Sequence, residues 1–206
     1  MKLFFRCYHW LLAGIMVLIA VILLINPAYQ PTASHSALII YIRSALQGDL
    51  AIGVFSGQPN RLDFTQLQVG DILLGGNPGG AYGHFTHAGL YLGQGQVLEG
   101  FVDCGLSRQS VEHYRNYDWA CILRVKLPEA TREVAAEYAR QREGRIFYPM
   151  AFKPGERYWN CTKIIWAAYQ EQGIDLDPFN DLWVTPDALY QSPWVEVVDS
   201  EGEIPL

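Results

Sequence analysis

The 206-residue chain is poor in basic residues, with 15 lysines and arginines against 21 aspartates and glutamates and a formal net charge of −6. Nucleic-acid binding needs a basic face, so this deficit excludes nucleic acid as the expected partner. It also argues against a polybasic attachment to anionic lipid. Repeats and low-complexity tracts are absent, while hydrophobic residues make up 50% of the chain. The composition therefore indicates one globular domain with a real core.

Cysteine is scarce too, with four residues in the chain. Cys104 and Cys121 could form a disulfide in an oxidising compartment, or each could pack as a small buried hydrophobic side chain. The sequence leaves both interpretations open. No arrangement of cysteines and histidines has the spacing of a zinc-binding motif, so we expect no metal and no other cofactor.

The one long apolar run lies at the N-terminus. Residues 10–25 carry no charged side chain, Lys2 and Arg6 precede them, and Pro27 ends the run. We expect an uncleaved transmembrane anchor within residues 1–29, because no convincing signal-peptidase site follows; a cleaved secretory signal is the alternative. The positive-inside rule then keeps the N-terminus in the cytoplasm and places the rest of the chain on the periplasmic side of a single-pass membrane protein.

The remaining chain is expected to form a connector over residues 30–60 and a folded domain over residues 61–206. Strand-like runs at residues 85–92 and 96–101 are joined by Gly-Gln-Gly, which is a hairpin signal. Further elements are expected as a short strand after Gly70, strands over 119–127 and 194–198, helices over 128–142 and 160–172, and a short helix from Thr185. This order predicts an α+β fold in which helices pack on a small antiparallel sheet or barrel.

Cys161 is the first candidate for chemistry. Asn160 is a good N-cap and places Cys161 at the first position of its helix. The free backbone N–H groups and the positive dipole end there stabilise a thiolate, and they can also bind the oxyanion of a tetrahedral intermediate. The alternative is a core cysteine on the apolar stripe of the helix, and the local pattern does not decide between the two.

His87 is the candidate base, in a strand-like run beside Gly89, which leaves room above the sheet for another side chain. A neutral imidazole there can accept the thiol proton and return it to a leaving group. A three-residue hairpin loop would place Glu99 diagonally from His87 on the same face, where it fixes the imidazole tautomer. A two-residue loop would place Glu99 on the other face. A structural histidine and a solvated glutamate are the alternatives.

Four further residues are expected to line the substrate cleft. His84 is expected in the loop at its mouth, Tyr158 and Trp159 lead into the cysteine helix, and Asn160 caps it. Core packing of the aromatic residues is the alternative.

A zinc site is a weaker interpretation of the same histidines. His84 and His87 could bind zinc together with Cys161 or Glu99, but their spacing is not diagnostic. His113 has no companion in the sequence that suggests chemistry.

Three blocks together resemble the circularly permuted NlpC-type papain-like cysteine hydrolases, most closely the YaeF/YiiX branch of predicted amidases. They are Val69-Gly-Asp-Ile-Leu-Leu, Phe85-Thr-His-Ala-Gly-Leu-Tyr-Leu-Gly followed by Val97-Leu-Glu-Gly, and Trp159-Asn-Cys-Thr-Lys-Ile-Ile-Trp-Ala-Ala-Tyr. The match covers about residues 67–194, and the histidine strand precedes the cysteine helix as in the permuted branch. The resemblance implies a permuted papain-like fold with Cys161 as nucleophile, His87 as base and Glu99 as the third polar residue. Thr162 departs from the serine expected after the cysteine.

These residues predict a thiol hydrolase that cleaves an amide or ester bond through a Cys161 thioester. Its substrate would be a small molecule or peptide, such as a cell-wall peptide or a modified amino acid. The first alternative is a lipid-directed acyltransferase or acyl hydrolase, because the permuted branch includes relatives of lecithin–retinol acyltransferase, although Glu99 stands where those relatives have a second histidine. The second alternative is a membrane-tethered binding module without turnover.

Overall fold

The computed structural model describes residues 2–25, 36–49 and 52–204. The chain divides into two compact units, Met1–Gln30 and Pro31–Leu206. The first unit holds helix α1 (Lys2–Ile25). Within the described residues, no helix combines the length and apolar character needed to cross a membrane, so the predicted transmembrane anchor has no support from this structure.

Six strands of the second unit form one antiparallel sheet in the order β4-β3-β2-β1-β5-β6. The strands are β1 (Ile72–Gly76), β2 (His87–Gly93), β3 (Gln96–Phe101), β4 (Gly105–Ser110), β5 (Trp119–Val125) and β6 (Val195–Glu201). The predicted α+β class with a small antiparallel sheet is thus confirmed. Strand β4 was not predicted, because Leu106 is its one fully buried residue and its sequence lacks a clear apolar alternation.

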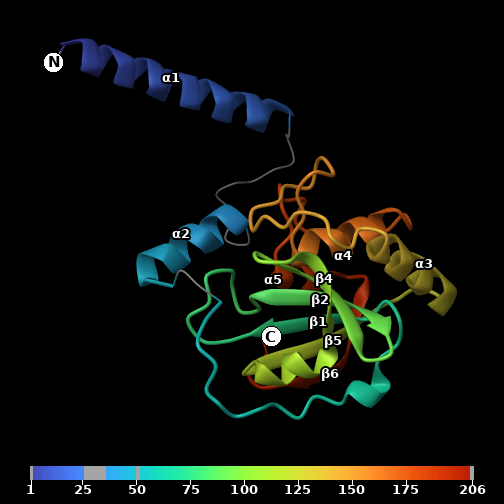
Figure 1. Ribbon diagram of the computed structural model, residues 1–206. Helices are drawn as coiled ribbons and strands as arrows, with labels where there is room; N and C mark the ends of the chain where they lie inside the picture. The colour runs from blue at the N-terminus through green and yellow to red at the C-terminus, as the bar shows by residue number, and fades with distance from the viewer. Residues whose placement is uncertain (1, 26–35, 50–51, 205–206) are drawn as a thin grey trace. The chain divides into compact units, whose positions relative to one another are not determined.

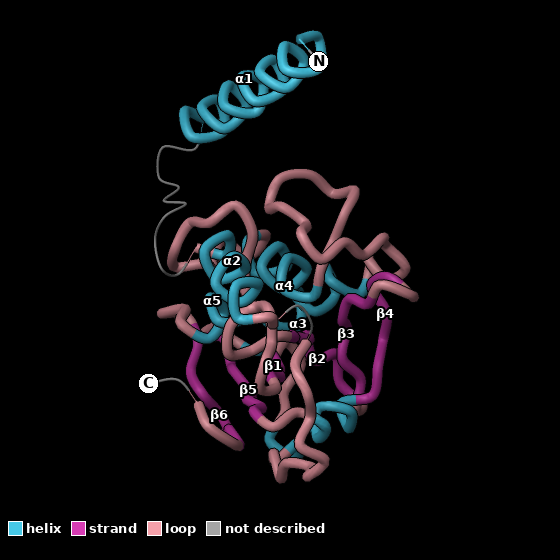
Figure 2. The backbone as a smooth tube through the Cα atoms, turned by 90° about the vertical axis from the view of Figure 1, so that its left-hand side faces the viewer, coloured by secondary structure: helices cyan, strands magenta, loops and turns pink. Residues whose placement is uncertain are grey.

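Helices cover one face and one end of this sheet (Figure 1). They are α2 (Ala37–Gln47), α3 (Glu129–Arg140), α4 (Cys161–Gln170) and α5 (Pro186–Tyr190). The second unit also contains two short 3₁₀ helices, η1 (Phe64–Gln66) and η2 (Val111–Asn116). Figure 2 shows α2, α4 and α5 gathered at the same end of the strands. His87, the first residue of β2, and Cys161, the first residue of α4, line one cavity.

Each face of the central strands has its own core. Ile72 and Leu74 belong to the cluster formed with α3 and α4, which includes Ile164 of α4. Leu73 points to the other face and belongs to a cluster that includes Tyr114 of η2. Burial of each such side chain contributes about 1.5–3 kcal/mol. Because both faces of β1 to β3 are covered, polar groups on these strands are buried and need partners.

The Gly-Asp turn before β1 has a structural role. Both oxygens of the fully buried Asp71 carboxylate bind Arg124 of β5, at 2.9 and 2.6 Å. The same carboxylate accepts a hydrogen bond from the Gln68 N–H at 2.8 Å. Asp71 therefore ties the turn to the neighbouring strand.

Helix α2 lies in the predicted connector and packs within the second unit. Ala37 is fully buried, and its N–H donates to Asp181 Oδ2 at 2.7 Å. The Tyr41 ring contacts Tyr82 edge-on, with the centroids 4.9 Å apart, and lies 6.3 Å from the Trp183 ring. Residues 36–49 thus form part of the folded unit and reach the surroundings of the candidate site.

Candidate active site

The hairpin between β2 and β3 decides which face of the sheet carries each candidate residue. Its turn consists of two residues, Gln94 and Gly95, with φ of 56° and 70°. In an unbroken register such a turn would place Glu99 on the face opposite to His87. A β-bulge between residues 91 and 93 shifts the register by one residue. Glu99 therefore returns to the face of His87 and lies diagonally from it.

His87 and Glu99 form a buried pair. The distance between His87 Nε2 and Glu99 Oε2 is 2.6 Å. Glu99 is fully buried, and His87 is 7% exposed. Cys161 and His87 line the same cavity, and the thiol is one of the groups that raise the pKa of the imidazole. Because Nε2 faces the carboxylate, Nδ1 is the nitrogen left for the thiol, which gives the order thiol, imidazole, carboxylate.

The two charges of this pair stabilise one another. Burial alone would lower the pKa of His87, but Tyr117, the Glu99 carboxylate and the Cys161 thiol hold it well above its ordinary value. We attribute this rise to Glu99, because burial raises the pKa of Tyr117 and keeps that phenol neutral. Burial would raise the pKa of Glu99, but His87 and His113 lower it. The favoured state is therefore an imidazolium beside a carboxylate.

Helix α4 begins at Cys161, and Asn160 is its N-cap. The Asn160 Oδ1 accepts a hydrogen bond from the Lys163 N–H at 2.7 Å, and Nδ2 donates to the Pro149 carbonyl at 3.0 Å. The first N–H groups of α4, those of Cys161 and Thr162, have no acceptor inside the helix. They are available to an oxyanion formed on a carbonyl that Cys161 attacks.

Thr162 fixes a neighbouring wall of the site. Its hydroxyl donates to the Val184 carbonyl at 2.6 Å, and the hydroxyl of the next residue, Thr185, caps α5 by accepting the Ala188 N–H at 3.1 Å. Thr162 therefore joins the cysteine helix to the loop before α5.

Two glycines permit the close approach of these elements. A Cβ at Gly89 would lie 2.7 Å from the Tyr114 hydroxyl oxygen and 2.9 Å from Glu99 Cγ. A Cβ at Gly100 would lie 3.2 Å from the backbone nitrogen of Cys161. The space expected beside His87 is thus occupied by Glu99, and the bare backbone of β3 admits the start of α4.

A cavity of about 180 Å³ lies beside Cys161 and His87. Its wall is mainly aromatic and aliphatic and comes from α2, the loop before β2, the end of β3 and the loops that flank α4. Besides the two candidate residues, it is lined by Tyr41, Ile52, Tyr82, Thr86, Gly100, Phe101, Val102, Tyr117, Phe147, Pro149, Asn160, Thr162, Trp183, Val184, Thr185 and Pro186. Asn160 is thus in the predicted cleft.

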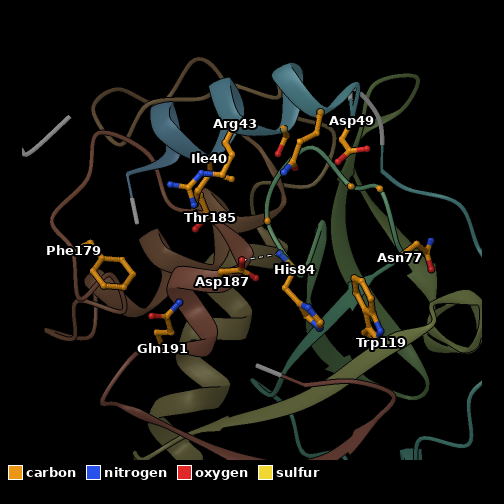
Figure 3. Close-up of a pocket in the computed structure, with 15 residues that line it drawn as sticks. Ile40, Arg43, Asp49, Asn77, His84, Trp119, Phe179, Thr185, Asp187 and Gln191 are labelled. Atoms are coloured by element: carbon orange, nitrogen blue, oxygen red, sulfur yellow. Dashed lines mark hydrogen bonds between the residues drawn. The ribbon is translucent and has the colours of Figure 1, made fainter. Parts of the chain in front are cut away.

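His84 lies in a different pocket, of about 570 Å³ (Figure 3). Its ring stacks on Trp119, with 4.0 Å between the centroids. Its backbone N–H and that of Phe85 donate to the two carboxylate oxygens of Asp187, each at 2.8 Å. These bonds connect the loop to α5, and His84 is not among the residues that line the cavity beside Cys161.

Tyr158 and Trp159 also lie outside the Cys161 cavity. Tyr158 is 40% exposed and packs against Tyr148, with the ring centroids 5.8 Å apart. Trp159 is 2% exposed and its indole N–H donates to the Glu156 carbonyl at 2.9 Å. A bridge between Phe147 and Trp159 brings this backbone against the preceding loop and turns the indole into the core. Core packing, the alternative reading, describes Trp159.

Two residues of the site were not found by sequence reasoning. His113 of η2 places Nε2 3.2 Å from Glu99 Oε2, so the carboxylate faces two imidazoles. Tyr117, just after η2, lies parallel to the His87 ring at 6.2 Å and lines the cavity. Neither carries a local signal, because both reach the site through the unpredicted strand β4 and the turn that follows it.

The cysteines in the described part of the chain are all free thiols. Cys104 is exposed and Cys121 is buried, so the disulfide that the sequence left open is not formed. Burial raises the pKa of Cys121 to about 12, which keeps that thiol protonated. Cys7 lies among the residues whose side chains are not described. Cys161 is therefore the described thiol with a histidine beside it.

One group of side chains among the described residues has the geometry to ligate a metal ion: His87, Glu99 and His113. Their ligand atoms lie within 4.8 Å of one another. The zinc alternative built on His84 is not supported, because His84 lies outside this group.

The fold and the site together define an α+β protein in which a capped cysteine helix meets a histidine and glutamate hairpin at one end of an antiparallel sheet. No protein-family model matches the chain, and no curated protein matches it. Among solved structures, the chain is similar to the crystal structure of the metalloprotein YiiX from Escherichia coli O157:H7, of the family DUF1105. The TM-score is 0.55 and the sequence identity is 16%, over 67% of this chain and 99% of that chain. A YiiX-like fold is therefore confirmed, while the papain-like catalytic class stays a prediction.

Proposed function

We propose that the protein is a thiol hydrolase that cleaves an amide or ester bond through an acyl-enzyme on Cys161. The observation that carries the proposal is that Cys161, at the start of α4, lines one cavity with His87, whose imidazole contacts the buried Glu99 carboxylate. A thiol, a base and a group that orients the base are the parts required for nucleophilic catalysis.

In the first half of the reaction, Cys161 Sγ attacks the substrate carbonyl carbon and the N–H groups at the start of α4 hold the oxyanion. The bond to the leaving amine or alcohol then breaks, and His87 supplies the proton that this group takes away. In the second half, water attacks the thioester carbon while His87 accepts a proton. The C–S bond breaks, which releases the acid and restores the thiol.

The test is the rate at which each thiol of the full chain reacts with iodoacetamide at pH 6. We expect one fast thiol, and Cys161→Ala should abolish the fast labelling. Cys104→Ala is the matched control: it removes an exposed thiol without a histidine partner and should leave the fast phase intact.

Fast labelling that persists in Cys161→Ala would contradict the assignment. If the folded protein has no thiol faster than free cysteine, the membrane-tethered binding module becomes the better description.

A lipid-directed acyl hydrolase or acyltransferase is a second candidate, favoured by the apolar wall of the cavity. Phe101, Phe147 and Trp183 would suit an aliphatic acyl group better than a charged peptide side chain. Incubation with phosphatidylcholine vesicles should then release fatty acid or yield an acylated acceptor, and Cys161→Ala should not. Absence of both products with the active wild-type thiol removes this candidate in favour of a soluble amide or ester. The membrane attachment and periplasmic location remain proposals as well.

A further inference from the structure

Three buried polar atoms around Glu99 have no hydrogen-bond partner. They are Glu99 Oε1, His113 Nε2 and the Tyr114 hydroxyl oxygen. The Tyr114 hydroxyl and Glu99 Oε1 border the same space above Gly89. Buried polar groups are nearly always satisfied, and a cluster of unsatisfied ones points to a bound ion or an ordered water.

The orientation of His113 suits a metal ligand. His113 Nδ1 lies 2.7 Å from the Ser110 carbonyl oxygen, and a carbonyl only accepts, so Nδ1 carries the proton. When Nε2 carries no proton, it presents a lone pair to the Glu99 carboxylate oxygen at 3.2 Å. The space between these two atoms can hold a proton or a metal ion. A histidine that ligates a metal commonly donates its other N–H to a backbone carbonyl in this way.

His87 completes a three-ligand set. One ligand atom from each of His87, Glu99 and His113 lies within 4.8 Å of the other two. Ligands about 2.0–2.2 Å from a shared tetrahedral zinc ion are about 3.3–3.6 Å apart, so the 2.6 and 3.2 Å contacts to Glu99 need to widen by less than about 1 Å. Two imidazoles and one carboxylate are a zinc-type set, whereas Mg²⁺ and Ca²⁺ prefer oxygen ligands throughout.

We propose that His87, Glu99 and His113 form a binding site for a divalent cation of the zinc class. The site does not depend on the thiol chemistry, because Cys161 is not one of its ligands and the ion is held at Nε2 of His87, the nitrogen beside Glu99. An ion at that position takes up the nitrogen that otherwise contacts Glu99. With a proton fixed on Nδ1, the imidazole has no free lone pair, so His87 is withdrawn from proton transfer while zinc is bound.

The test is competition for Zn²⁺ between the purified full-length protein and a chromogenic chelator. We expect one equivalent to bind, with an affinity that falls by at least about 10-fold in His113→Ala. His84→Ala is the matched control, because it removes a histidine outside the cluster, and Cys161→Ala removes the nearby thiol. Both variants should keep the wild-type affinity.

Zinc K-edge absorption of the wild-type protein supplies a measurement that does not rely on a folded variant. The first shell should contain nitrogen and oxygen at about 2.0–2.1 Å and no sulfur at about 2.3 Å. In the zinc-loaded protein, Cys161 should remain open to iodoacetamide. A sulfur ligand, loss of binding in Cys161→Ala, or equal weak binding by wild type and His113→Ala would each overturn the site. These outcomes are separate from a failure of the thiol to react, which bears on the proposed function.

Discussion

Replacing His87 by alanine is expected to slow the reaction of Cys161 with iodoacetamide at pH 6 by about 10²-fold. A cysteine without an imidazolium partner is only about 0.3% thiolate at that pH, and the thiolate is the reacting species. In the wild-type protein the imidazole of His87 lies beside the thiol and can hold its proton. The measurement is the second-order rate constant for alkylation in chelator-treated protein.

His84→Ala is the matched control for this substitution. It also removes a histidine from the loop before β2, but the His84 ring stacks on Trp119 in another pocket. The rate should stay at the wild-type value. Equal rates in wild type and His87→Ala, with both proteins folded by circular dichroism, would show that His87 does not assist the thiol.

Replacing Glu99 by glutamine is expected to lower the pKa of His87 and to change how stability depends on pH. The raised pKa of His87 contributes stability that is present below about pH 6.5, the unfolded value, and is lost as the pH rises through the folded value. The lowered pKa of Glu99 contributes stability that is present above about pH 4.3 and is lost as the pH falls through its folded value. The pair is therefore most stabilising between about pH 4.3 and 6.5.

Two measurements check this expectation in chelator-treated protein. An NMR titration of the His87 ring should give a lower pKa in Glu99→Gln than in wild type. The free energy of unfolding should differ most between the two proteins inside the stated pH window and less at pH 9. A loss of stability that is the same at every pH would mean that Glu99 acts through packing and not through its charge. Glu137→Gln, an exposed substitution on α3, controls for the loss of one negative charge.

The parts of the fold that were predicted are those fixed by local chemistry. The start of α4 follows from Asn160, whose side chain accepts the Lys163 N–H. The turn follows from Gly95, which adopts positive φ readily, whereas Gln94 takes a φ of 56° that glutamine seldom adopts. The bulge beside that turn has no such signal, although it decides whether Glu99 and His87 share a face. The sequence therefore left two registers open, and tertiary packing selects one.

Residues that reach the site over longer distances were not predictable in the same way. His113 meets Glu99 because β4 pairs with β3 and η2 then folds back over the sheet. The sequence of β4 is mostly polar and does not predict a strand, so this route to the site could not be predicted. Tyr158 and Trp159 are adjacent to the cysteine helix in the sequence, but the bridge from Trp159 to Phe147 turns this segment away from the cavity. For that reason, their closeness to Cys161 in the sequence does not place them at the cavity.

The separation of the two halves of the site has a consequence for the newly made chain. The hairpin that carries His87 and Glu99 precedes α4 in the chain, and Cys161 can approach the imidazole only once α4 docks on the sheet. Until α4 docks, Cys161 in the nascent polypeptide is an ordinary thiol that reacts slowly. The reactivity that we propose is therefore latent during synthesis and appears once the C-terminal third of the domain has folded.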